Sequence, residues 1–126
     1  MLDLSGSTIE TLSSVVKYCS SLEKIIFPTT LKTIDAAALQ GCKSLQELKL
    51  PEGMTTFGYT SDSQGWNSLK KVYWPASLLE FKILGQAKNL EELYYGGDEL
   101  QWSSVDHSFI DETKVAVHIG EPAWND

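Results

Sequence analysis

The sequence predicts a solenoid, in which short repeats stack and share one hydrophobic core, and two observations carry this prediction. Four segments have the same pattern of residues: SLEKIIFP (21–28), SLQELKLP (44–51), SLKKVYWP (68–75) and NLEELYYG (89–96). Their starts are 23, 24 and 21 residues apart, which is the period of leucine-rich repeats. A unit this short cannot bury its apolar face alone, so neighbouring units must stack. We therefore expect a leucine-rich-repeat solenoid with a short parallel β-sheet on one face and turns and short helical or irregular segments on the other.

Each of the four segments alternates between inward and outward residues with the period of a β-strand. In the first segment Ile25 and Phe27 point to one side, and the same alternation recurs in the other three. Three segments end at a proline, which has no N–H to continue a ladder, and the fourth ends at a glycine. Parallel strands are therefore expected at residues 2–4, 25–27, 48–50, 72–74 and 93–95, with residues 115–119 extending the same end of the sheet.

A second apolar pair recurs at fixed spacing between the strands. Its copies are Ile9 with Leu12, Leu31 with Ile34, Met54 with Phe57, and Leu78 with Phe81. A stretch of variable length follows, and it is closed three residues before the next strand leucine by Cys19, Cys42, Trp66 or Ala87. We expect the strand leucines and the second members of the later pairs to be nearly fully buried: Leu22, Leu45, Leu69, Leu90, Ile34, Phe57 and Phe81.

The segment TLKTIDAAALQGCKSLQELKLP (residues 30–51) resembles the repeats of the BspA-like leucine-rich repeat family. Its residues Ile34, Ala38, Leu39, Cys42, Leu45, Leu48, Leu50 and Pro51 fall where that repeat has Ile, Ala-Phe, Cys or Asn, Leu, Ile, Ile and Pro. The resemblance covers nearly the whole chain. It implies attachment to a cell surface or secretion, adhesion, and interaction with other proteins.

The repeat register divides the chain as a single domain, residues 1–126. Residues 1–20 form a truncated first repeat, residues 21–43, 44–67 and 68–88 form full repeats, and residues 89–126 hold the last strand and a C-terminal cap. Because residues 2–5 align with residues 25–28, we expect that at least one earlier repeat is missing and that the chain is the C-terminal part of a longer protein. The segment YYGGDELQWSSV resembles the end of BspA-like arrays, and a cap is what an open last coil needs.

Composition excludes several classes of function. Ten basic and 17 acidic side chains give a net charge of −7, which disfavours binding to a phosphate backbone, so nucleic acid is not expected as a partner. No apolar run has the length of a membrane-spanning helix. No cofactor is expected either, because the chain holds no phosphate-cradling glycine loop and no metal-binding or nucleophile motif.

Two groups of residues in the sequence have reactive side chains. Asp106, His107 and Ser108 are the types of a catalytic triad, but contiguous residues cannot converge in that geometry, so no catalytic residue is expected. Cys19 and Cys42 stand one repeat apart, on neighbouring coils, where a disulfide is possible. Separate buried thiols are the favoured alternative, and a zinc site is excluded because the two histidines lack ligand spacing.

The outward strand positions form columns across the sheet. One column reads Lys24, Glu47, Lys71, Glu92, and another reads Glu23, Gln46, Lys70, Glu91. We interpret both as a solvated charge ladder that sets the strand register. A third column reads Asp3, Ile26, Lys49, Tyr73, Tyr94. Exposed aromatic and apolar residues flanked by charge are typical of interaction sites, so Ile26, Lys24, Lys49, Tyr73 and Tyr94 are the candidate binding face.

Three tryptophans have alternative interpretations. Trp66 is expected to fill the core position of Cys19 and Cys42 rather than to lie in an exposed loop, and Trp102 is expected in the core of the cap. Trp124, near the terminus, could belong to either a core or a binding surface.

Two hypotheses on function remain from these patterns. The first is a non-catalytic module of a cell-surface or secreted protein that binds another protein, or a glycan, through the strand face. The second is a structural spacer whose missing N-terminal region carries the activity, and an enzyme ranks third. An exposed patch of Ile26, Tyr73 and Tyr94 would favour binding, whereas burial of these side chains would favour the spacer.

Overall fold

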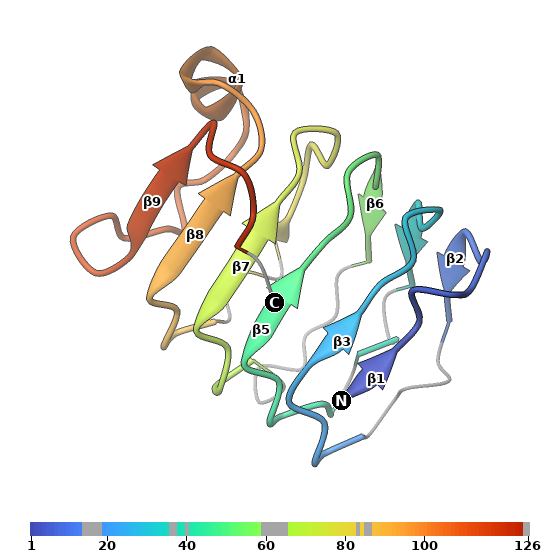
Figure 1. Ribbon diagram of the computed structural model, residues 1–126. Coiled ribbons are helices and arrows are strands. Elements are labelled where there is room, and N and C mark those ends of the chain that lie inside the picture. Colours follow the sequence, from blue (N-terminus) through green and yellow to red (C-terminus); the bar gives the residue numbers. More distant parts are fainter. Residues whose placement is uncertain are drawn as a thin grey trace.

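The computed structural model describes residues 1–13, 19–35, 38–39, 41–58, 66–82, 84 and 87–124. The chain winds into a β-solenoid, and one strand of each coil lies on a common face (Figure 1). The strands on this face are β1 (Leu2–Asp3), β3 (Ile25–Ile26), β5 (Glu47–Lys49), β7 (Lys71–Trp74), β8 (Glu92–Tyr95) and β9 (Ala116–Ile119). Every hydrogen-bonded pair among them is parallel, so the predicted repeat solenoid and its six strands are confirmed.

A second parallel sheet, not predicted from the sequence, lies on another face of the coils. Its strands are β2 (Thr11–Leu12), β4 (Thr33–Ile34) and β6 (Thr56–Phe57). The expectation of turns and helical or irregular segments was therefore wrong at these positions. The apolar pairs at these positions are three residues apart and so show no period of two, although a β-branched threonine stands outward in each strand.

Two repeating main-chain hydrogen bonds set the turns of each coil. The N–H of each strand leucine donates to the carbonyl of the closing residue, as from Leu45 to Cys42 and from Leu69 to Trp66, both at 3.2 Å. The residue three positions after each proline donates back to that proline's carbonyl, as from Leu31 to Pro28 at 3.2 Å. Because the bonds use only the main chain, the closing side chain can change between Cys, Trp and Ala.

The core confirms most of the predicted inward positions. Leu45, Leu69, Leu90, Ile34 and Phe81 are buried, and so is Trp66 in its closing position. The prediction was wrong for Leu22 and Phe57, which are half-buried. Among the described residues β6 is the last strand of its sheet, so no described strand follows Phe57 there.

The two cysteines are reduced thiols, as the favoured alternative predicted. Cys42 is buried, and this burial raises the pKa of its thiol. Cys19 is only half-buried, which differs from the expected full burial.

The last coil is covered by α1 (Glu99–Ser104) and β9. Asp98 begins the helix with a capping box, since its side chain accepts from the N–H of Gln101 while the Gln101 side chain accepts from the N–H of Asp98. The helix places Trp102, which is buried, against the rings of Trp74 and Tyr95 at 5.6 and 5.1 Å. The predicted core position of Trp102 is therefore confirmed, although the helix itself was not predicted.

Candidate binding face

The outward side of the strand face has the register that the columns predicted. Asp3 lies beside Ile26, and Lys49 lies beside Tyr73, which in turn lies beside Tyr94. Pairing of β9 with β8 adds His118 to the same column. The sequence analysis missed His118 because the register of the cap strand could not be aligned with the repeat pattern.

Part of the predicted charge ladder is present in the neighbouring columns. The Lys24 ammonium lies 3.7 Å from Glu47, and that of Lys70 lies 3.6 Å from Glu91. The side-chain amide of Gln46 donates to Glu23 at 2.8 Å. Partly exposed pairs of this kind contribute roughly 0.2 to 1 kcal/mol each, so their main effect is on the register of the strands.

Tyr73 does not stand in water, and this corrects the expectation of an exposed side chain. Only 6% of the residue is exposed. Its hydroxyl donates to the Glu52 carboxylate in the preceding turn, and the ring lies against Gly96, where a side chain would collide with the hydroxyl. The pKa of Tyr73 is raised, mainly by desolvation and to a smaller extent by the hydrogen bond to Glu52.

The segment that follows β9 turns back over the strand face. It crosses β8 and β7 toward β5 (Figure 1) and places the Trp124 ring 5.5 Å from the ring of Tyr94. The ammonium groups of Lys71 and Lys49 lie 4.8 and 5.4 Å from the Trp124 ring, and Lys49 also donates to the Trp124 carbonyl at 2.8 Å. Cation–π contacts and one hydrogen bond therefore hold this tryptophan on the predicted binding face.

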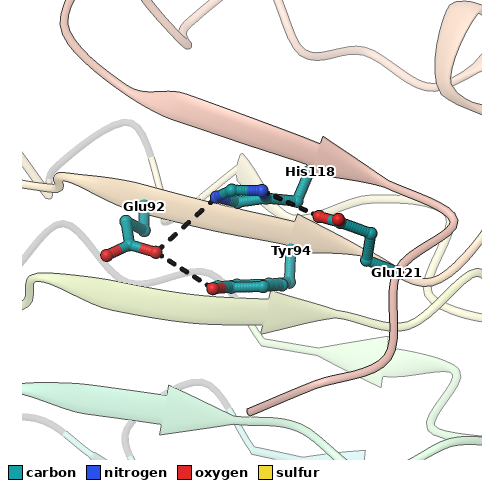
Figure 2. Close-up of polar contacts among 4 residues, drawn as sticks. All are labelled: Glu92, Tyr94, His118 and Glu121. Carbon is teal, nitrogen blue, oxygen red and sulfur yellow. Dashed lines mark hydrogen bonds and ion pairs between the residues drawn. The ribbon is translucent and has the colours of Figure 1, made fainter.

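A polar cluster holds the beginning of this tail (Figure 2). The His118 ring stacks on Tyr94 at 4.4 Å, and its Nδ1 lies 2.8 Å from the Glu121 carboxylate. On the other side, Nε2 lies 3.6 Å from Glu92, which also accepts a hydrogen bond from the Tyr94 hydroxyl at 3.0 Å. This hydrogen bond raises the pKa of Tyr94, because it stabilises the protonated phenol.

The strand face remains open between β3, β5 and the tail. A hollow of about 200 Å³ lies there, and Lys24, Ile26, Glu47, Lys49 and Trp124 are among its lining residues. Ile26 is half-buried and does not belong to the hydrophobic core cluster. Three of the five predicted site residues, Lys24, Ile26 and Lys49, therefore surround one hollow.

The other two predicted residues do not join it. Tyr73 is buried and Tyr94 is half-buried beneath the tail, so Ile26, Tyr73 and Tyr94 do not form one exposed patch. Trp124 also lines the hollow, and the sequence had left open whether this residue belongs to a core or to a binding surface. Its place could not be read from the repeat pattern, because it follows the last repeat.

The reactive residue types elsewhere have structural partners. Ser108 donates to Asp106 at 2.8 Å, whereas the His107 ring stacks on Trp102 at 4.0 Å and has its Nδ1 3.1 Å from the Val105 carbonyl. These three residues do not form a relay. Within the described residues no cluster of three or more His, Cys, Asp or Glu could hold a metal ion.

The comparisons with known proteins identify the repeat. A family model described as BspA type Leucine rich repeat region (6 copies) matches residues 3–93. No curated protein and no solved structure matches the chain.

Proposed function

Since the chain belongs to the BspA-type leucine-rich repeat family, we propose that it is a non-catalytic binding module that holds a partner on its strand face. The partner is a protein, with a glycan as the second possibility. The protein acts at a cell surface or after secretion, as the BspA-like resemblance implies. Among the described residues no helix has the length and apolar character needed to span a membrane.

The hollow on the strand face is the observation that supports this proposal most. Ile26 stands at an outward strand position, where a solvated ladder would use a polar residue, and it contributes nothing to the core cluster. Lys24, Lys49 and Trp124 border it. An apolar floor beside an aromatic wall is typical of interaction hot spots, and the Lys24–Glu47 ion pair and Lys49 supply the polar rim.

The rest of the described surface supports binding over catalysis. A catalytic site needs a nucleophile, a base or a metal in mutual geometry, and a repeat scaffold by itself supplies none of these. The only motif with triad residue types, residues 106–108, makes local contacts instead.

The experiment replaces Ile26 by Glu and compares capture of partner proteins, and binding to a glycan array, with the unmodified protein. Leu79→Glu is the matched control, because Leu79 is 68% exposed and lines a different hollow beside α1. We expect Ile26→Glu to lose binding and Leu79→Glu to retain it. Equal binding by both variants would contradict the proposed face.

A structural spacer is the second candidate function, and one observation favours it. Tyr73 is buried and Tyr94 is covered by the tail, so both tyrosines of the expected face are occupied by the chain itself. If neither variant changes any binding, the spacer is the better description.

A further inference from the structure

We propose that the strand face binds an extended peptide segment with an aromatic side chain. The binding site, called the seat, is formed by Lys49, Lys71 and Tyr94. The chain's own residues Glu121–Trp124 occupy the seat until such a peptide displaces them. The inference rests on the proposed function and specifies the partner of the same face. The expected partner is a peptide, because a peptide segment of the chain occupies this site in the structure.

The tail shows which chemistry the face accepts. Two ammonium groups lie within cation–π distance of the Trp124 ring, Lys71 at 4.8 Å and Lys49 at 5.4 Å, and the ring of Tyr94 lies 5.5 Å from it. An electron-rich ring face is the group that such a pair of cations binds. Lys49 also donates to the main-chain carbonyl of Trp124, so the seat recognises a peptide group as well as a ring.

The contacts of the tail are those of an occupant that can leave. The Trp124 indole nitrogen is buried, and no described residue accepts its hydrogen bond. An orphaned buried N–H weakens the seated state. Glu121 and Pro122 are exposed, and Trp124 is not part of the core cluster, so release of the tail leaves the solenoid intact.

The neighbouring hollow supplies room for a second side chain. It lies over Ile26 and borders the seated tryptophan, so a peptide that follows the path of the tail would place its aromatic residue over the lysines and an adjacent apolar residue over Ile26. A partner peptide can fill both the seat and the hollow over Ile26, whereas the tail fills the seat and leaves the hollow open. This difference gives the partner an advantage over the internal segment.

The experiment measures binding of a fluorescein-labelled, amidated peptide with the sequence of residues 119–124, IGEPAW, by fluorescence anisotropy. In the unmodified protein the tail occupies the seat. The apparent affinity for the peptide is then the intrinsic affinity multiplied by the fraction of molecules whose seat is open. We expect Trp124→Ala to bind the peptide about tenfold tighter or more, because this variant empties the seat. Glu121→Ala, which weakens the hold of His118 on the tail, should increase binding in the same direction.

Two controls test the chemistry of the seat. The peptide IGEPAA should bind no variant, since it lacks the ring. Adding Lys49→Gln and Lys71→Gln to Trp124→Ala should abolish binding of IGEPAW, while an unchanged melting temperature shows that the fold is retained.

The inference is overturned if emptying the seat leaves peptide binding unchanged, or if IGEPAA binds as well as IGEPAW. It is also overturned if Trp124→Ala instead loses binding to a glycan, because the tryptophan would then be a sugar platform rather than an internal occupant. In each case the proposed function stands on its own if Ile26→Glu still abolishes capture of a partner.

Discussion

At the scale of single residues, two tyrosines of one column have different surroundings. Tyr73 is buried and hydrogen-bonded to Glu52, whereas Tyr94 is half-buried between His118 and Trp124. Replacing Tyr73 by Ala should therefore destabilise the fold as well as alter the face. Tyr94 is the better residue for separating binding from stability.

The close approach of Tyr73 to Gly96 gives a first prediction. A methyl group at position 96 would collide with the Tyr73 hydroxyl and come within 3.3 Å of the Ala76 nitrogen. Gly96→Ala should cost about 1 to 3 kcal/mol, as overpacking does. In a Tyr73→Phe background this cost should fall, and urea denaturation of the four proteins measures the difference. Equal costs in both backgrounds would show that the hydroxyl is not the obstacle.

The raised pKa of Tyr73 gives a second prediction, on alkaline stability. In the unfolded chain the phenol ionises near pH ~10, whereas in the folded protein desolvation and Glu52 keep it protonated to higher pH. The unfolded state therefore binds fewer protons above that pH, and stability present below it is lost as the pH rises.

Denaturation at about pH 9 and about pH 11 measures this loss. Tyr73→Phe should lose less stability between the two conditions than the unmodified protein. Part of the loss should remain, because burial also raises the pKa of Tyr95. If Tyr73→Phe loses as much stability between the two pH values as the unmodified protein, ionisation of Tyr73 is not a cause of the alkaline loss of stability.

At the scale of elements, the four strand segments of the repeat were readable because each combines three inward residues with a proline or glycine stop. The second sheet was not readable, since the apolar pairs that precede and enter its strands, such as Leu31 with Ile34, are three residues apart, which is not the period of a strand. The helix α1 has six residues and only one buried side chain, Trp102, so it has no apolar periodicity to detect. Its capping box was the available signal, as Asp98 and Gln101 stand three residues apart.

The strand leucines give a third prediction. Leu45 is 1% exposed between two complete coils, so Leu45→Ala should cost about 2 to 5 kcal/mol. Leu22 is half-buried, so Leu22→Ala should cost clearly less. Guanidinium titration of both variants measures the two free energies of unfolding. A larger loss at Leu22 than at Leu45 would contradict the burial described for the first coil.

At the scale of the whole molecule, the repeat predicts where a binding face lies but not how much of it is open. The columns through Lys24, Ile26 and Lys49 follow from the strand register. The tail that covers Tyr94 follows from contacts of Trp124 and His118, which lie outside the repeat and have no period to align. The long-range contacts of a terminal segment depend on side-chain packing, so a local sequence pattern cannot predict them.

The proposed binding function requires that a partner lies on the strand face over Ile26. Site-specific photo-crosslinking tests it most directly, because it reports which residue the partner touches. A photoreactive amino acid replaces Ile26 in one protein and the exposed Leu79 in the matched control. We predict a crosslinked partner from position 26 and none from position 79. A partner that crosslinks equally from both positions, or only from position 79, would contradict the claim.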